Sequence, residues 1–191
     1  MRPPAAQRDG MSESDLTLDL NDSAATEALG AALADALPTA SPIPSDAPRI
    51  RGNATVVYLQ GDLGTGKTTC ARSLLHALGV AGIVRSPTYT LVESYAGTGI
   101  QCIHVDLYRL RGPEELEDLG LRDSLAPGNL LLIEWPERGG AELPPADLVV
   151  NLSYRDEGRK AILQARSPYG ERWIDDLRTD SRIIPYLSNL T

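Results

Sequence analysis

The sequence predicts an α/β fold in which helices flank a mixed central β-sheet, and three neighbouring features support this prediction. Ala54–Gln60 is a short apolar run with several β-branched residues, which is typical of a buried strand. A glycine-rich loop follows at Gly61–Thr69, and a helical pattern continues from Thr68 to Leu78. A strand, a glycine-rich loop and a helix in this order are the parts of one α/β unit.

The loop between this strand and this helix has the spacing of a phosphate-binding loop. Gly61 and Gly66 are five positions apart, and Lys67 and Thr68 follow directly. Glycines allow the positive φ angles with which such a loop turns its N–H groups inward around a phosphate. The lysine adds a charge for the β- and γ-phosphate oxygens, and the threonine hydroxyl is a ligand for Mg²⁺. The residues predicted to contact a nucleotide here are Asp62, Leu63, Gly64, Thr65, Gly66, Lys67, Thr68 and Thr69.

The alternative interpretation of the loop is a glycine-rich turn that binds nothing. Lysine occurs in this chain only at Lys67 and Lys160, so a chance match to the pattern is rare. The helix that follows the loop also directs its positive N-terminal end at a bound anion. Because strand, loop, lysine, hydroxyl and helix agree, the sequence favours a P-loop NTPase-like fold that binds a nucleotide.

The segments before this unit predict a short N-terminal addition to the domain. Residues 1–15 are polar and rich in Pro and Ser, and we expect a disordered tail there. Leu16–Leu20 alternates with period two, which predicts an edge strand. Asn21–Ser23 then offers N-cap oxygens to a helix that ends near Leu37. A Pro-rich insertion at 38–51 has no core pattern and predicts a loop.

After the phosphate-binding loop and its helix, extended and helical patterns alternate. Arg85–Thr90 is rich in hydroxyl groups, and Pro87 favours an extended backbone there. We expect one domain over 16–178 and a C-terminal tail over 179–191, in which a few apolar residues are candidates for packing. Strands are predicted at 90–95, 100–105, 130–134, 147–154 and 160–166, and helices at 113–119 and 168–177.

Composition limits the class of protein and its surroundings. With 191 residues, 42% hydrophobic and 23% charged, the chain is typical of a globular protein. No apolar run approaches the ~20 residues that cross a membrane, and two cysteines make no disulfide framework. We therefore expect a cytoplasmic protein that does not associate with a membrane. The net charge of −8 argues against a large nucleic-acid footprint, so any role in RNA chemistry should run through a partner.

Two carboxylates follow apolar strands and are candidates for chemistry at the phosphates. Glu134 follows the very apolar Leu130–Ile133 and is the preferred ligand for Mg²⁺. Asp106 follows Cys102–Val105 and could orient or deprotonate an attacking water, or share the outer shell of the metal. The alternative for Asp106 is a solvated strand end or a helix cap.

Two further polar residues have open interpretations. Thr88 could contact the γ-phosphate or its metal, as in a loop that orders with a triphosphate, or it could be an ordinary turn residue. His104 lies within a predicted strand, and the sequence favours a core or packing role for it. Cys70 and Cys102 are not spaced as metal ligands.

Four blocks, in their order and spacing, resemble the TsaE (YjeE) family of small bacterial ATPases in tRNA threonylcarbamoyladenosine biosynthesis. The blocks are Gly61–Thr69, Ser86–Glu93, His104–Leu110 and Ile133–Glu137, and the resemblance covers about residues 16 to 166. It implies a P-loop fold with a mixed sheet, ATP and Mg²⁺, and a cytoplasmic setting. It also implies the partners TsaD and TsaB, which transfer threonylcarbamoyl to adenosine 37 of tRNA, so tRNA is contacted only indirectly.

The resemblance also implies roles for single residues. Lys67 matches the phosphate-binding lysine, Thr68 and Glu134 match the Mg²⁺ ligands, and Asp106 matches the acidic residue needed for hydrolysis. Ser86–Thr90 matches a switch-like segment. Nucleotide contacts are further implied at Ser23 and near Gly158 and Arg159. The chain departs from the family in the insertion at 38–51 and in both tails, and the insertion weakens the match at Ser23.

Other classes make different demands on the sequence. A signalling GTPase needs an Asn-Lys-x-Asp motif, which this chain lacks, and a phosphotransferase for a small substrate needs an arginine-rich lid, which the pattern does not show. A non-catalytic, ATP-gated adaptor would use many of the same residues. No arginine finger is recognisable in the sequence pattern, so we expect hydrolysis to be slow without partners.

Overall fold

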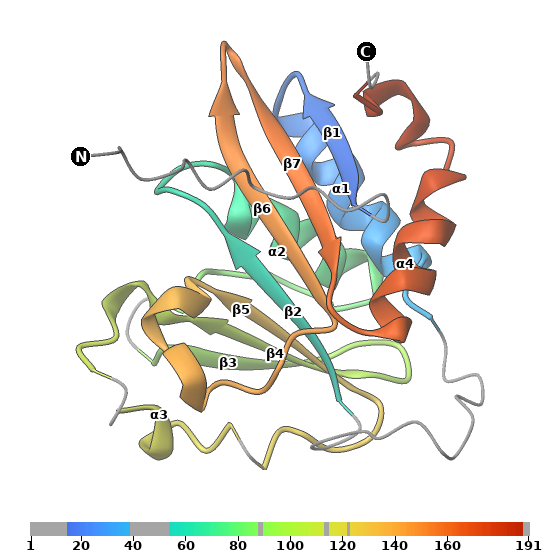
Figure 1. Ribbon diagram of the computed structural model, residues 1–191. Helices are drawn as coiled ribbons and strands as arrows, with labels where there is room; N and C mark the ends of the chain where they lie inside the picture. Colours follow the sequence, from blue (N-terminus) through green and yellow to red (C-terminus); the bar gives the residue numbers. More distant parts are fainter. Residues whose placement is uncertain (1–14, 39–53, 88–89, 113–114, 122, 189–191) are drawn as a thin grey trace, which may run out of the picture.

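A mixed β-sheet of seven strands forms the centre of the molecule, seen in a computed structural model (Figure 1). The residues that the structure describes are 15–38, 54–87, 90–112, 115–121 and 123–188. The strand order is β1-β7-β6-β2-β5-β4-β3. The strands are β1 (Leu16–Leu20), β2 (Thr55–Gln60), β3 (Val92–Ala96), β4 (Gln101–Asp106), β5 (Asn129–Glu134), β6 (Leu148–Arg155) and β7 (Gly158–Ala165).

The four middle strands β6, β2, β5 and β4 run parallel to one another, whereas the outer pairings β6–β7, β7–β1 and β4–β3 are antiparallel. Parallel neighbours end at the same edge of a sheet, so residues at their carboxyl ends meet there. The register pairs Asp106 of β4 with Glu134 of β5, and Glu134 with Leu59 of β2. The sheet thus brings the two predicted carboxylates to the edge at which the phosphate-binding loop begins.

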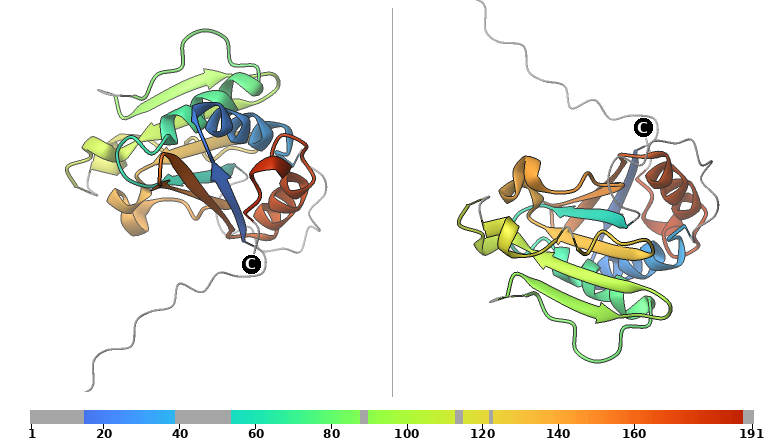
Figure 2. Two further views of the ribbon diagram at one scale, coloured as in Figure 1. Left: turned by 90° about the horizontal axis from the view of Figure 1, so that it is seen from above. Right: turned by 90° about the horizontal axis from the view of Figure 1, so that it is seen from below.

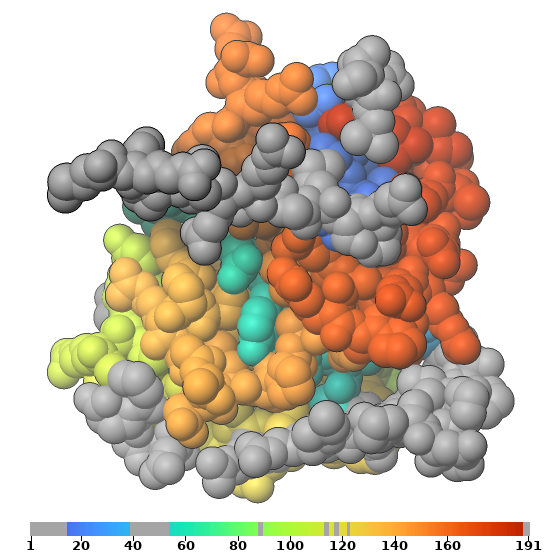
Figure 3. Space-filling view, viewed as in Figure 1, coloured from blue at the N-terminus to red at the C-terminus, as the bar shows by residue number. Residues whose placement is uncertain are grey.

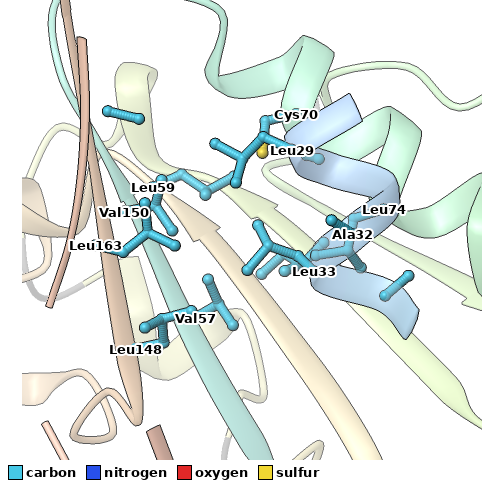
Figure 4. Packing of buried hydrophobic residues seen from close by; sticks show 14 of the residues in the cluster. Leu29, Ala32, Leu33, Val57, Leu59, Cys70, Leu74, Leu148, Val150 and Leu163 are labelled. Atoms are coloured by element: carbon cyan, nitrogen blue, oxygen red, sulfur yellow. The ribbon is translucent and has the colours of Figure 1, made fainter. Parts of the chain in front are cut away.

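Two helices, α1 (Ser23–Asp35) and α2 (Lys67–Ala77), lie side by side on one face of the sheet (Figures 1 and 2). Gly30 allows this close approach, because a Cβ at this position would lie 2.4 Å from the carbonyl oxygen of Cys70. Leu29 and Leu33 of α1 and Leu74 of α2 pack with buried residues of β2, β6 and β7 (Figure 4). Burying each of these leucines contributes about 1.5–3 kcal/mol, so this layer holds α2 and its N-terminus in place.

The opposite face of the sheet is covered by the connections between strands. Val56, Ile103, Val105, Leu131 and Ile133 point into a second buried cluster. These connections include α3 (Glu115–Asp118) and the 3₁₀ turns η1 (Leu107–Arg109), η2 (Pro136–Arg138) and η3 (Gly140–Glu142). Part of β2, in teal, reaches the surface of this face (Figure 3).

Helix α4 (Pro168–Arg178) closes the domain beside α1 and β7. The Ser167 hydroxyl caps it by accepting from the backbone N–H of Gly170 at 3.1 Å. Trp173 is fully buried, and its ring N–H donates to the carbonyl of Leu33 at 2.9 Å. Beyond α4, Ile183 is buried, the turn η4 spans Ile184–Tyr186, and Leu187 pairs with Leu18 of the edge strand β1.

Every described strand and helix that the pattern predicted is present, with boundaries that differ by a few residues. The helix predicted at 113–119 is a single turn, Glu115–Asp118. The strands predicted at 147–154 and 160–166 are joined by a shorter connection than these bounds imply, because β6 continues to Arg155 and β7 begins at Gly158. The predicted mixed sheet with flanking helices is confirmed. The predicted N-terminal tail up to residue 14 and most of the insertion at 38–51 lie outside the described residues.

The two cysteines, Cys70 on α2 and Cys102 on β4, are fully buried in the hydrophobic cluster that helices α1 and α2 share with the sheet. Burial raises the pKa of Cys70 to about 12 and that of Cys102 to about 11. Both thiols stay protonated in the folded chain, so below the ordinary thiol pKa their ionisation does not affect the free energy of unfolding. Above that pKa the thiols ionise in the unfolded chain first. The free energy of unfolding then falls by about 1.4 kcal/mol per pH unit for each thiol, until the folded thiol also ionises.

We therefore expect a thiol reagent to label neither cysteine in the folded chain at pH 8. The thiolate is the reactive form, and the folded chain neither ionises nor exposes it. Absorbance with Ellman's reagent should show no fast labelling without urea and two labelled thiols in a urea concentration that unfolds the chain. Rapid labelling without urea would contradict the buried placement of the cysteines.

Candidate nucleotide site

The phosphate-binding loop connects β2 to α2 and has the predicted left-handed glycines. Gly61, Gly64 and Gly66 have φ angles of 132°, 80° and 104°. At Gly61 a side chain is excluded by space as well, because a Cβ would lie 1.9 Å from the carbonyl oxygen of Leu152. The Thr65 hydroxyl donates to the carbonyl of Asp62 at 2.9 Å and so closes the loop on itself. This conformation is the one in which backbone N–H groups can surround an anion.

Lys67, at the start of α2, is held inside the loop. Its ammonium group donates to the carbonyls of Gly61 at 2.6 Å and Asp62 at 2.8 Å. The same nitrogen lies 3.9 Å from the centre of the Trp135 ring, and the residue is only 4% exposed. Burial lowers the pKa of Lys67 from its ordinary value, and the negative charge of Glu134 opposes this shift. The ammonium charge is thus placed at the loop and shielded from water.

Thr68 and Glu134 lie next to each other. The Thr68 hydroxyl donates to Oε2 of Glu134 at 2.9 Å, and Glu134 is only 1% exposed. The second carboxylate oxygen, Oε1, lies 2.9 Å from Nε2 of His104, a fully buried residue on the neighbouring strand β4. His104 is therefore a core residue, as the sequence favoured, but it also contacts the candidate metal ligand, which the sequence did not predict.

Asp106 ends β4 on the same edge of the sheet. Its Oδ2 accepts from the Ser86 hydroxyl at 2.5 Å, and its Oδ1 accepts from the backbone N–H of Tyr108 at 3.0 Å. The second contact makes Asp106 the N-cap of η1, and this cap does not exclude a chemical role for the same carboxylate. The first contact ties Asp106 to the segment that was predicted to respond to the nucleotide.

A cleft of about 350 Å³ opens between the loop and these strand ends. Nine of the residues predicted for the site line it, namely Leu63, Gly64, Gly66, Lys67, Thr68, Thr69, Asp106, Glu134 and Arg159. The other lining residues are Ser86, Pro87, Tyr108, Arg109 and Trp135.

Four predicted site residues do not line this cleft. Asp62 is exposed and Thr65 is buried, and the two are joined by a hydrogen bond within the loop. Gly158 lines a neighbouring hollow of about 500 Å³ that shares Arg159 with the cleft. Ser23 is exposed as the first residue of α1, which Asp22 caps, and it lines neither hollow. Thr88 lies outside the described residues.

Sequence reasoning missed an aromatic group on one wall of the cleft. The rings of Tyr108 and Trp135 are 5.0 Å apart between centres, and the Arg138 guanidinium lies 5.1 Å from the Tyr108 ring. Trp135 has a φ angle of 58°, a left-handed conformation that a residue other than glycine rarely adopts. Its place directly after Glu134 was the available signal for this group.

Arginine is also more prominent at the site than the sequence indicated. Arg109 and Arg159 both line the cleft, although they are fifty positions apart in the chain. The Arg159 Nε lies 3.3 Å from the position that a Cβ of Gly66 would take. Slow hydrolysis by the free protein therefore does not follow from an absence of arginine at the site.

The oxygen groups at Thr68 and Glu134 fit Mg²⁺. In the described part of the chain, no group of three or more His, Cys, Asp and Glu side chains could hold a metal ion. Two neighbouring oxygen donors suit Mg²⁺ nevertheless, because this ion is usually bound by one or two protein groups together with phosphates and water.

The fold and the site define a class of protein. A phosphate-binding loop with its lysine and threonine, next to a buried glutamate at the carboxyl edge of a mixed sheet, is the arrangement of a nucleotide-binding P-loop NTPase-like protein. The chain belongs to the TsaE family, whose model, described as threonylcarbamoyl adenosine biosynthesis protein TsaE, matches residues 20–162.

Individual relatives agree with the family. The chain is 50% identical over 121 residues to the tRNA threonylcarbamoyladenosine biosynthesis protein TsaE of Haemophilus influenzae, covering 63% of this chain and 77% of that protein. It is 34% identical over 117 residues to the protein of the same name from Treponema pallidum, covering 61% of this chain and 86% of that protein. The crystal structure of Bacillus subtilis YdiB superposes with a TM-score of 0.63 at 24% identity, covering 85% of this chain and 93% of that one, and supports the fold.

No helix in the described part of the chain is long and apolar enough to cross a membrane.

Proposed function

We propose that this protein is a Mg²⁺-dependent, ATP-hydrolysing accessory protein of tRNA N6-threonylcarbamoyladenosine biosynthesis. In this proposal it acts on the complex of TsaD and TsaB and supports the turnover of that complex. The observation that carries the proposal is the convergence of Lys67, Thr68 and Glu134 on one cleft, with Asp106 on the adjacent strand. The family name supports the pathway.

Each residue has one task in this proposal. Lys67 and the loop N–H groups bind the phosphates, and Thr68 and Glu134 hold Mg²⁺. The ion, when bound, neutralises charge on the phosphate oxygens. Asp106 orients the attacking water or accepts its proton. Thr88 contacts the γ-phosphate region, and further nucleotide contacts are proposed for Ser23, Gly158 and Arg159.

The free protein should hydrolyse ATP slowly, for reasons found in its contacts. Both oxygens of Asp106 are engaged, one by Ser86 and one by the N–H of Tyr108. The ammonium group of Lys67 is bonded to carbonyls of its own loop. A partner that moves Ser86 would release one oxygen of Asp106. Such a partner favours the conformation with the released Asp106 only if it binds that conformation more tightly than the other.

Partners, location and domain extent are part of the same proposal. The net charge of −8 disfavours direct tRNA binding, so we propose that tRNA is reached only through TsaD and TsaB. Two free, buried thiols are consistent with a reducing cytoplasm. We propose one ATPase domain over 16–178, with an N-terminal tail at 1–15 and a C-terminal tail at 179–191.

We expect ATP to bind at least about tenfold more tightly than GTP, a difference of about 1.4 kcal/mol. The sequence has no Asn-Lys-x-Asp motif, the group with which GTPases recognise guanine. Isothermal titration with each nucleotide and Mg²⁺ measures both dissociation constants. Equal or tighter binding of GTP would contradict the ATPase assignment.

A further inference from the structure

His104 is the one histidine of the described β-strands, and its environment is unusual for a packing residue. The ring is fully buried, and its Nε2 lies 2.9 Å from Oε1 of Glu134, which is itself only 1% exposed. The other oxygen of Glu134 accepts from the Thr68 hydroxyl at 2.9 Å. The carboxylate is thus held from two sides, by a histidine on one oxygen and by the second candidate metal ligand on the other.

The two contacts differ in how firmly they are fixed. His104 lies within β4, and Glu134 ends β5, the strand that pairs with β4 in parallel. The backbones of both residues are therefore fixed by the sheet. Thr68 lies in the first turn of α2, next to the phosphate-binding loop, and its hydroxyl is the other proposed metal ligand. The contact from His104 is the one that can persist when Thr68 and Oε2 bind an ion.

The hydrogen-bonding of the ring supports a role beyond packing. A carboxylate that binds a metal is ionised and only accepts, so Nε2 must carry the proton and donate. The other ring nitrogen, Nδ1, is buried without a hydrogen-bond partner among the residues that the structure describes. An unpaired buried polar atom costs about 1–3 kcal/mol, a cost that a leucine of similar size would avoid. The bond to Glu134 is what a leucine could not supply.

We propose that His104 is a positioning residue that orients the Glu134 carboxylate for Mg²⁺. By holding Oε1, it directs Oε2 at the Thr68 hydroxyl, and these two oxygens form the pair that faces the ion. Groups that hold a metal ligand in this way typically change metal affinity by 10–100-fold. This inference rests on the proposed function, since it takes Glu134 as a metal ligand.

The experiment compares the dissociation constant of ADP in EDTA with that in Mg²⁺, by isothermal titration. The ratio of the two constants measures the coupling between ion and nucleotide without any hydrolysis. His104→Leu should lower this ratio by about 10-fold or more, or bring it to one, and leave the constant in EDTA within about twofold of the wild type. His104→Gln places an amide N–H near the position of Nε2 and should restore most of the ratio. His104→Asn is too short to reach Glu134 and should not.

His76 is the matched control, because it is the only other histidine of the chain and is exposed at the end of α2. His76→Leu should leave the ratio unchanged. Glu134→Gln tests the metal assignment of Glu134 separately from the role of His104. If Glu134→Gln keeps the wild-type ratio, the metal assignment in the proposed function is wrong. If Glu134→Gln lowers the ratio but His104→Leu and His104→Asn do not, or if His104→Gln fails like them, the role of His104 is wrong.

A measurement on the unmodified protein removes any dependence on how the variants fold. Nitrogen-15 NMR of the two histidine rings reports which nitrogen carries the proton. His104 should carry it on Nε2, with Nδ1 bare, both in the free protein and with Mg²⁺ and ADP bound. A ring protonated on Nδ1 alone could not donate to Glu134 and would overturn the proposal.

Discussion

Replacing Asp106 with asparagine should reduce ATP hydrolysis by about 10²- to 10⁴-fold and leave ATP binding nearly unchanged. A carboxylate that acts on the attacking water contributes in the transition state and little in the bound ground state. Asparagine keeps an oxygen for the backbone N–H of Tyr108, so the cap of η1 is preserved. The substitution removes the charge, the proton-accepting capacity and the second oxygen, which accepts from the Ser86 hydroxyl.

Two measurements test this result, phosphate release at saturating ATP and the dissociation constant of ATP. Asp175→Asn, an exposed aspartate on α4, is the control and should behave as the wild type in both. Hydrolysis by Asp106→Asn at the wild-type rate would remove Asp106 from the mechanism. A wild-type chain that binds ATP and releases no phosphate, even with its partners, would favour the adaptor alternative.

The second large effect is expected for Lys67→Ala, which should weaken ATP binding by about 10- to 150-fold. This range corresponds to the 1.5–3 kcal/mol of a hydrogen bond to a charged group. The lysine is buried beside the Trp135 ring, so its charge faces the phosphates with little screening by water. Isothermal titration with ATP and Mg²⁺ gives the constant directly.

The control for this variant is Lys160→Ala, on β7, which removes the same charge at a partly exposed position. Lys67→Ala also leaves the carbonyls of Gly61 and Asp62 without their ammonium donor, so its urea midpoint should be measured as well. A folded Lys67→Ala protein that binds ATP as tightly as the wild type would show that the phosphates do not lie at this loop.

The parts of the fold that sequence predicts best are those decided by local pattern. The order of strand, glycine-rich loop and helix around Lys67 depends on spacing within about twenty residues, and the structure contains these three elements in that order. The same holds for the alternation in Leu16–Leu20, which indicates the edge strand β1. Local spacing does not fix boundaries as firmly, since the helix predicted at 113–119 is one turn long.

The contacts that sequence could not predict join residues far apart in the chain. His104 and Glu134 meet because β4 and β5 are neighbours in one register, and no spacing in the sequence states that register. Arg109 and Arg159 reach one cleft for a similar reason, as residues after β4 and on β7. The position of Trp135 depends on a left-handed backbone that residue type alone disfavours.

The central claim is that this protein couples ATP hydrolysis to the TsaD–TsaB complex, and steady-state phosphate release tests it most directly. The assay uses ATP and Mg²⁺ with the chain alone, then with both partners, and with Asp106→Asn in each mixture to subtract hydrolysis by the partners. We predict slow release from the chain alone and a clear rise with both partners, which Asp106→Asn abolishes. A fast rate that the partners leave unchanged, or a rise that persists with Asp106→Asn, would contradict the claim.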